Sequence, residues 1–157
     1  MAGIEQVKSF LAQHGLEVLE FEVPTPTVET AAAAVGCDPA EIAKSILLLI
    51  GKSPLLVVAC GDRKVNSSLL KKAAGLSGKV TMPTPEQVLQ LTGYPPGGVC
   101  PFLMPDELPV LLDLSLQRFP TIYPAGGNRF SAVPIDYQNL QQLTSGREVD
   151  VTLPLES

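Results

Sequence analysis

The sequence is poor in the side chains that most enzymes use for catalysis. It has one histidine (His14), three cysteines and no tryptophan in 157 residues, and aromatic residues make up 5%. Cys37, Cys60 and Cys100 are odd in number and widely spaced, so they predict neither a disulfide framework nor a zinc site. His14 adjoins Gly15 at a predicted helix end and is interpreted as a surface residue. We therefore expect no metal and no cofactor.

Charged residues and long apolar runs are also scarce. Charged residues make up 17%, and no apolar run approaches the ~18 residues of a membrane span. Glu5 and Lys8 interrupt the first ten residues, which favours a helix over a signal peptide. These features predict a cytoplasmic protein without membrane association, and the net charge of −5 argues against a general DNA-binding protein. With 45% hydrophobic residues, residues 1–157 suffice for a single domain.

Glycine and proline, in contrast, are concentrated in residues 93–102, which read GYPPGGVCPF. Proline fixes its own φ angle, and Gly97 and Gly98 permit backbone angles that other residues avoid. The stretch therefore predicts a stiff loop with accessible backbone N–H groups. A rigid loop can direct such groups at an oxyanion, although a tight connection between two buried elements is the simpler interpretation.

Capping residues and apolar spacing divide the rest of the chain into short elements. Helices are predicted at 4–11, 28–35 after Thr27, 67–74, 85–92 after Thr84 and 137–143 after Asp136. Strands are predicted at 16–23 (ended by Pro24 and Pro26), 46–50, 55–60, 110–113, 121–123, 130–135 and 149–153. The strands at 46–50 and 55–60 should form a buried hairpin. The pattern predicts an α+β fold with a mixed, curved sheet flanked by helices.

One segment carries a concentration of positive charge. Between residues 63 and 85 there are five basic residues and no acid, whereas the rest of the chain has six basic residues against all 16 acids. The five are Arg63, Lys64, Lys71, Lys72 and Lys79. A solvated helix face is the ordinary explanation of such a cluster, but in an acidic protein it also predicts contact with a phosphate-bearing partner.

Few candidates for catalysis remain. Cys100 lies in the stiff loop, but no histidine or asparagine partner is evident, so a thiol nucleophile is disfavoured. Asp113 ends a predicted strand, where a structural role and a role in a site are equally compatible with the pattern. Lys44 at the start of the hairpin and two glycine loops (97–98 and 126–127) can hold an anion or a carbonyl oxygen without any nucleophilic side chain.

Several of these motifs, in this order, resemble the YbaK/ProX family of aminoacyl-tRNA deacylases, which also occurs as an editing domain inserted in prolyl-tRNA synthetases. The resemblance extends from about residue 21 to residue 151. It rests on Ala31-Ala32-x-x-Val35-Gly36-Cys37-x(4)-Ile42-Ala43-Lys44-Ser45-Ile46, Thr92-Gly93-Tyr94-x-x-Gly97-Gly98-Val99-x-Pro101-Phe102, Asp113 and Ala125-Gly126-Gly127.

The resemblance implies a fold and a reaction. The fold would be a mixed, barrel-like β-sheet with surrounding helices, and the reaction the hydrolysis of the ester between a wrong amino acid and the terminal ribose of a tRNA. Lys44 would orient the terminal nucleotide or the carbonyl. The backbone amides of Gly97, Gly98 and Val99 would bind the carbonyl oxygen, while a water or a group of the substrate attacks. Substrate-binding roles are implied for Ser45, Pro101, Phe102, Asp113, Gly126, Gly127 and Asn128, with Gly126 and Gly127 as the pocket floor.

Two departures from the family bear on the substrate. Leu103 and Met104 follow Pro101-Phe102, where many relatives have glycine and a polar residue. Ala132 stands where cysteine-specific relatives have an acid. Both changes favour a small, uncharged amino acid such as alanine, serine or threonine on tRNA-Pro. The resemblance also implies prolyl-tRNA synthetase as a partner, and leaves a Cys-tRNA-Pro deacylase and a non-catalytic tRNA- or synthetase-binding module as alternatives.

Overall fold

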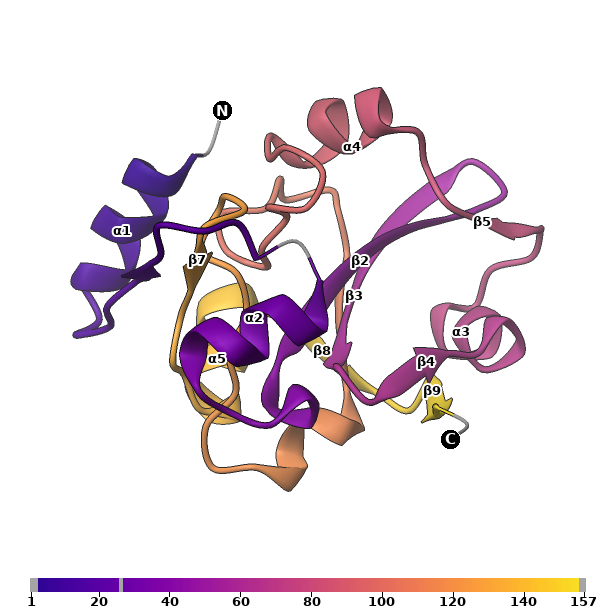
Figure 1. Cartoon of the computed structure of the whole chain (residues 1–157). Coiled ribbons are helices and arrows are strands. Elements are labelled where there is room, and N and C mark those ends of the chain that lie inside the picture. Colours follow the sequence, from indigo (N-terminus) through magenta and orange to yellow (C-terminus); the bar gives the residue numbers. More distant parts are fainter. Residues whose placement is uncertain (1–2, 26, 156–157) are drawn as a thin grey trace.

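The computed structural model describes residues 3–25 and 27–155 and shows helices packed around a mixed β-sheet (Figure 1). Its α-helices are α1 (Ile4–Ala12), α2 (Val28–Val35), α3 (Ser67–Ala74), α4 (Pro85–Thr92) and α5 (Tyr137–Thr144). Its strands are β1 (Leu19–Glu20), β2 (Ala43–Ile50), β3 (Ser53–Cys60), β4 (Arg63–Val65), β5 (Val80–Thr81), β6 (Val110–Asp113), β7 (Ser131–Ala132), β8 (Arg147–Val149) and β9 (Thr152–Pro154). Two 3₁₀ helices, η1 (Pro39–Glu41) and η2 (Leu114–Arg118), complete the described elements.

Local capping explains why the helices begin and end where the sequence predicts. Thr27 begins α2 and Thr84 begins α4, each with a reciprocal capping box that satisfies two N–H groups of the first turn. Gly36 and Gly93 end these helices in the left-handed conformation that favours glycine. The bounds of α2 and α4 are therefore fixed by interactions between residues close together in the sequence.

The central sheet has the order β5-β2-β3-β6-β8. β2 and β3 form the predicted hairpin over eight residue pairs. β6 pairs with β3 in parallel, and β8 pairs with β6 in parallel. The α+β class and the mixed sheet are thus confirmed. The sheet stays open, with β5 and β8 as its edges, and two-stranded sheets β1–β7 and β4–β9 lie beside it.

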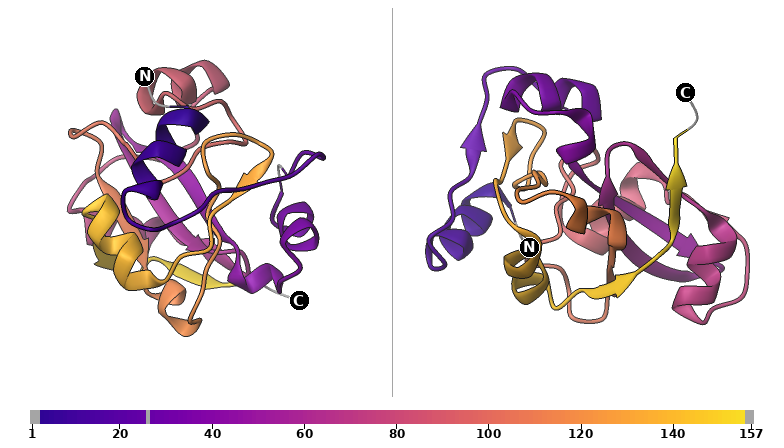
Figure 2. Two further views of the ribbon diagram at one scale, coloured as in Figure 1. Left: turned by 90° about the vertical axis from the view of Figure 1, so that its left-hand side faces the viewer. Right: turned by 90° about the horizontal axis from the view of Figure 1, so that it is seen from below.

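The hairpin separates two apolar clusters because neighbouring residues of a strand point to opposite faces. Leu56 and Val58 pack into the larger cluster with α1, α5 and the glycine loop, and Leu55 and Val57 pack into the smaller one with α3. Figure 2 shows α1 and α5 on one side of the molecule and α3 on the other. Among the described residues, no helix reaches the length and hydropathy of a membrane span.

Several predicted strands are shorter than the sequence pattern suggests. The strand predicted at 16–23 is reduced to β1, and the one at 130–135 to β7, which pairs with it. The stretch at 121–123 makes only single bridges, Ile42 to Tyr123 and Ile122 to Ile135. Prolines 120, 124 and 134 lack the N–H group that a longer ladder needs. Pro26 lies outside the described residues.

Candidate active site

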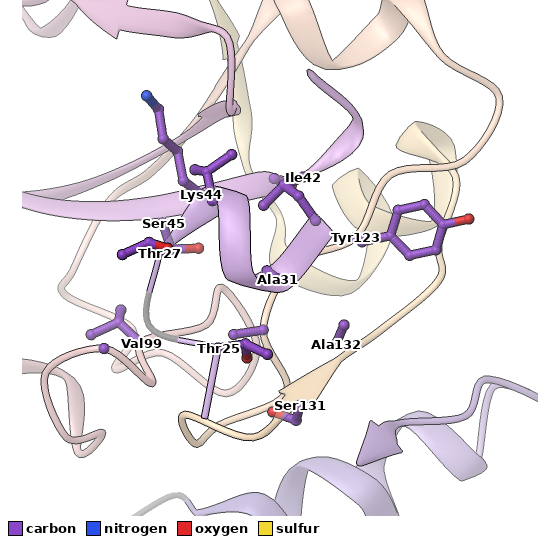
Figure 3. A pocket seen from close by; sticks show the side chains of 14 residues that line it. Thr25, Thr27, Ala31, Ile42, Lys44, Ser45, Val99, Tyr123, Ser131 and Ala132 are labelled. Atoms are coloured by element: carbon purple, nitrogen blue, oxygen red, sulfur yellow. The ribbon is translucent and has the colours of Figure 1, made fainter. Parts of the chain in front are cut away.

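A small pocket lies where α2, the start of β2 and the two glycine loops meet (Figure 3). Its volume is about 160 Å³. Its lining is mostly apolar or hydroxyl-bearing, and among the residues that the structure describes Lys44 is its only charged one. The lining residues are Thr25, Thr27, Val28, Ala31, Ile42, Ala43, Lys44, Ser45, Gly97, Val99, Tyr123, Ala125, Ser131 and Ala132.

Lys44 lies on β2, paired with Ala59 of β3, at the rim of this pocket. Its side chain lies at the opposite end of the pocket from Ser131 (Figure 3), and its ammonium donates a hydrogen bond to the carbonyl oxygen of Arg63 on β4. Burial lowers the pKa of Lys44, although the carboxylates of Asp62 and Glu29 act in the opposite direction. An ammonium has three donors, so Lys44 keeps donors for a ligand.

A chain of hydrogen bonds connects the partner of Lys44 to Asp113. Arg63 Nε donates to Thr152 Oγ1 at 3.0 Å, and Thr152 Oγ1 donates to Asp113 Oδ2 at 2.8 Å. The Asp113 carboxylate also accepts from the backbone N–H groups of Ser115 and Val151. Asp113 is 1% exposed and is not a pocket residue. The structure therefore gives Asp113 a structural position, not the substrate contact that the resemblance implied.

Ser45 follows Lys44 and carries an unpaired hydroxyl. Its Oγ is buried and has no hydrogen-bond partner among the described residues, and the residue lines the pocket as the resemblance implied. A buried hydroxyl without a partner loses free energy unless a ligand or water supplies one. Ser45 is thus a residue of this wall whose buried hydroxyl lacks a partner among the described residues.

The first glycine loop contributes Gly97 and Val99 to the pocket, but not Gly98. The N–H group of Gly98 is already used, because it donates to the Pro95 carbonyl at 2.9 Å. No hydrogen bond among the described residues uses the N–H groups of Gly97 or Val99. Of the three amides predicted to bind an oxyanion, the structure therefore leaves two available and places the third in a turn.

The second glycine loop supports the pocket from behind. Gly126 and Gly127 are buried but are not among the lining residues. A Cβ on Gly126 would lie 2.6 Å from Val18 Cγ1, and one on Gly127 would lie 3.3 Å from Ile4 backbone atoms. These glycines permit close packing and do not form the predicted floor. The loop contributes Ala125 instead, and the following strand contributes Ser131 and Ala132.

Asn128 and Ser131 hold that second loop in shape. Asn128 Oδ1 accepts from the N–H of Phe130 at 2.9 Å, so the side chain forms a local turn and does not face the pocket. Ser131 Oγ accepts from the N–H of Gly126 and donates to the carbonyl of Asn128. The structure thus gives Asn128 a supporting role in this loop, and its substrate contact stays a prediction.

The residues after Val99 turn away from the pocket into the interior. Cys100, Pro101 and Phe102 are buried and none of them lines it. Leu103 and Met104, predicted to form an apolar pocket wall, line a separate hollow beside Phe10. The substrate-binding roles predicted for Pro101 and Phe102 therefore become packing roles.

Changing Cys100 to serine should leave catalysis unchanged. Burial raises the pKa of the Cys100 thiol to about 12, so the thiolate fraction at pH 7 is on the order of 10⁻⁵. The thiol also points away from the pocket, toward the Phe102 carbonyl. We expect unchanged kcat/KM and a loss of about 1 kcal/mol in unfolding free energy, because a hydroxyl is buried. Acyl transfer to the thiol, detected by mass spectrometry, would contradict this.

Changing Asp113 to asparagine should destabilise the protein. Burial alone would raise the pKa of Asp113, but the hydrogen bonds from Ser115, Val151 and Thr152 outweigh it and lower the pKa. The carboxylate therefore stabilises the fold above pH ~4, and this contribution disappears as pH falls through the lowered pKa. We expect a loss of about 2–3 kcal/mol at pH 7 in denaturant unfolding. Asp106→Asn, at an exposed site, is the matched control and should change little.

The basic segment lies next to the Lys44 end of the pocket. β4 carries Arg63, whose carbonyl binds Lys44, and α3 follows it along the chain (Figure 1). Lys64, Lys72 and Lys79 are exposed, and Lys71 is half-buried. Arg63 donates two hydrogen bonds to Thr152, which uses donors that were predicted to reach a tRNA. Four of the five predicted basic contacts thus stay accessible.

Comparison with known proteins agrees with the motifs. A family model described as the aminoacyl-tRNA editing domain matches residues 22–143. The chain belongs to the aminoacyl-tRNA editing domain family. The resemblance to the YbaK/ProX family is therefore confirmed.

Two curated relatives and one solved structure show how widely this editing domain occurs. The uncharacterized protein YwhH of Bacillus subtilis (strain 168) is 37% identical over 144 residues, with 90% of each chain covered. Proline--tRNA ligase of Aquifex aeolicus (strain VF5) is 32% identical over 99 residues, which are 60% of this chain but only 17% of the ligase. A crystal structure described as that of a proposed trans-editing enzyme for prolyl tRNA synthetase has a TM-score of 0.85 at 29% identity and covers 96% of both chains.

Several residues of the site escaped the sequence analysis. Thr25 and Ser131 carry polar atoms at the pocket, and Tyr123 forms part of its rim. Arg129 lies over the first glycine loop, where three of its side-chain atoms would be within 3.4 Å of a Cβ on Gly97. For Arg129, the sequence offered one signal, its position two residues after Gly127 of the second glycine loop. The other residues lie in stretches without a motif.

Proposed function

We propose that this editing domain hydrolyses the ester of mischarged aminoacyl-tRNA, and that its substrate is a small, uncharged amino acid on tRNA-Pro. One observation carries the proposal. Lys44, Ser45 with its unpaired hydroxyl, and Gly97 and Val99, whose N–H groups no described residue uses, all line a single small pocket.

The size and lining of the pocket favour a small aminoacyl group. About 160 Å³ is close to a ~150 Å³ cavity that holds one benzene molecule. An alanyl, seryl or threonyl group has similar bulk. A synthetase pocket for proline excludes smaller amino acids poorly, because a methylene contributes only about 1–3 kcal/mol to discrimination. A second pocket with different walls corrects the resulting errors.

Catalysis in this pocket would rest on stabilisation of charge. A water oxygen attacks the ester carbonyl, and the carbonyl oxygen becomes an oxyanion that the N–H groups of Gly97 and Val99 can bind. The bond between the carbonyl carbon and the ribose oxygen then breaks. One proton of the attacking water ends on the ribose oxygen, so the products are free tRNA and the free amino acid. Lys44 provides positive charge for the terminal nucleotide beside the ester.

A panel of mischarged tRNAs tests this proposal directly. The pure protein is incubated with tRNA-Pro carrying alanine, serine, threonine, cysteine or proline, and ester loss is timed against the uncatalysed reaction. We expect fast loss of one or more of the small amino acids and no loss of proline. Preferential loss of cysteine would identify a Cys-tRNA-Pro deacylase instead. Binding of tRNA without any ester loss would indicate a non-catalytic module.

The two lysines of α3, Lys71 and Lys72, should contribute to tRNA binding. Reversing Lys71 and Lys72 to glutamate should weaken binding of every tRNA alike and flatten the dependence of log Kd on log salt by about one unit per lost phosphate contact. The preference among amino acids should stay the same, because neither lysine lines the pocket. The measurement is affinity for one tRNA at several salt concentrations.

A second double variant controls for net charge in that experiment. Reversing Lys8 and Lys52 changes the net charge equally, but Lys8 lies on α1 and Lys52 in the hairpin turn. Its affinity and salt slope should resemble those of the wild type. Equal losses in both double variants would mean that only net charge matters and that the basic segment makes no specific contact.

A further inference from the structure

The pairing of β4 with β9 explains why a carbonyl of β4 faces the pocket lysine. The two strands are antiparallel and lie side by side near the C-terminus, with Arg63 opposite Pro154 (Figure 1). The neighbouring pair is hydrogen-bonded, because the Leu155 N–H donates to the Asp62 carbonyl. Hydrogen-bonded and non-hydrogen-bonded pairs alternate along an antiparallel ladder. The Arg63 carbonyl therefore points away from β9, and there it accepts from the Lys44 ammonium.

The side chain of Arg63 crosses back to β9 and fixes the residue that carries this carbonyl. Its Nε donates to Thr152 Oγ1 and its Nη2 donates to the Thr152 carbonyl, each at 3.0 Å. Two bonds from one planar guanidinium fix direction as well as distance. Thr152 is 2% exposed, so water has little access to either acceptor. The peptide group that binds Lys44 is thus held by the side chain of its own residue.

Thr152 is fastened in turn to the central sheet. Its Oγ1 donates at 2.8 Å to Oδ2 of Asp113, which ends β6. β6 pairs with β3, and β3 pairs with β2, the strand that carries Lys44. These contacts close a ring, which runs from Lys44 through the sheet to Asp113. It then returns through Thr152 and Arg63 to the Lys44 ammonium. Both ends of the Lys44 hydrogen bond are therefore fixed relative to the same sheet.

We propose that Thr152 and the side chain of Arg63 are positioning residues for the Lys44 ammonium. A lysine side chain is flexible, so a carbonyl in a fixed place decides where its charge lies. A displacement of about 1 Å at a catalytic group can lower a rate by about 100-fold. Neither Arg63 nor Thr152 lines the pocket, so both act through Lys44. The inference rests on the proposed function, because the rate that they control is that of deacylation.

Two substitutions of Thr152 test the role of its hydroxyl. Valine has the shape of threonine without the hydroxyl, whereas serine keeps the hydroxyl. In Thr152→Val we expect kcat for deacylation to fall about tenfold or more, with KM for tRNA unchanged because the pocket lining is unchanged. Thr152→Ser should recover most of the lost kcat. Rates are compared at a temperature where unfolding curves show every variant folded. A wild-type kcat in Thr152→Val would overturn the proposal.

A double-mutant cycle shows whether Thr152 acts through Lys44. In a Lys44→Ala background, Thr152→Val should lower the single-turnover rate no further, because the group that it positions is gone. The same fold-loss in both backgrounds would mean a general structural role and would overturn the proposal.

Thr144→Val is the matched control for loss of a hydroxyl. Thr144 Oγ1 donates to the Leu140 carbonyl at 2.7 Å at the end of α5, and the residue does not line the pocket. This substitution should lower the stability and leave kcat unchanged. If Thr144→Val lowered kcat as much as Thr152→Val does, the loss would come from destabilisation and the positioning role would be wrong.

Arg63→Lys distinguishes positioning from contact with tRNA, the role that the basic segment predicted for Arg63. Lysine keeps the positive charge for a phosphate, but it has no planar fork with which to bind both acceptors of Thr152. We expect kcat to fall as in Thr152→Val, and the salt dependence of tRNA binding to stay the same. An unchanged kcat in Arg63→Lys would overturn the positioning role.

The proposed function and the positioning role fail in different ways. If the wild type releases no amino acid from any mischarged tRNA, the proposed function is wrong and the positioning role falls with it. If the wild type deacylates tRNA and Thr152→Val does so equally fast, only the positioning role is wrong.

Discussion

Deacylation by the Lys44→Ala variant should fall by about 100-fold or more in kcat/KM, as is usual when a group that stabilises charge in the transition state is removed. Within residues 3–25 and 27–155, Lys44 is the only charged residue that lines the pocket, and its ammonium donates to the Arg63 carbonyl. Burial lowers the pKa of Lys44, which means that the charged ammonium reduces the free energy of unfolding. We therefore expect the variant to be at least as stable as the wild type in denaturant unfolding.

Lys52→Ala is the matched control for this change. It removes the same charge from the same hairpin, but from the exposed turn at the other end. Its deacylation rate should equal that of the wild type. A Lys44→Ala variant that deacylates mischarged tRNA at the wild-type rate would show that Lys44 only fastens β2 to β4, and the assigned site would then be wrong.

Elements specified by neighbouring residues were predictable from the sequence. α2 begins at Thr27 and ends at Gly36, as predicted, because the caps act within a few residues. The hairpin was also predictable, because its two strands are neighbours in the sequence. However, β2 begins at Ala43, three residues earlier than expected. Lys44 and Ser45 thus lie on a strand, and both residues line the pocket.

Glycines were harder to interpret, because a glycine permits close approach of any neighbour. The sequence shows that Gly126 tolerates close contact, but not whether the neighbour is a ligand or Val18. Likewise, the direction of the Gly98 N–H group depends on the turn with Pro95. Motif positions therefore indicate which segments meet at the pocket, but not which surface each residue presents.

The remaining pocket residues come from segments that only the tertiary fold brings together. Thr25 donates from its backbone N–H and its hydroxyl to the carbonyl of Arg129, more than one hundred positions later in the chain. Ser131 faces the same pocket from a two-residue strand. Neither segment has a helical or strand period long enough to predict its partner.

Gly98→Ala should lose most activity and also destabilise the protein. A Cβ at this position would lie 2.7 Å from Cα and 2.9 Å from the carbonyl carbon of Asn128, which is closer than real Cβ contacts. The methyl group would not enter the pocket, because Gly98 does not line it. It would instead push the two glycine loops apart. Overpacking of this kind costs about 1–3 kcal/mol, and it would shift the neighbouring N–H groups of Gly97 and Val99.

Gly75→Ala separates the loss of stability from the loss of activity. Gly75 ends α3 with a φ of 67°, and a Cβ there would meet nothing within 4 Å. The substitution should cost about 1–2 kcal/mol through backbone strain alone and leave deacylation unchanged at a temperature where the variant is folded. Because Gly98→Ala displaces two oxyanion donors, we expect at least a tenfold lower kcat at that same temperature. Equal activities of the two folded variants would mean that the spacing between the glycine loops does not control the reaction.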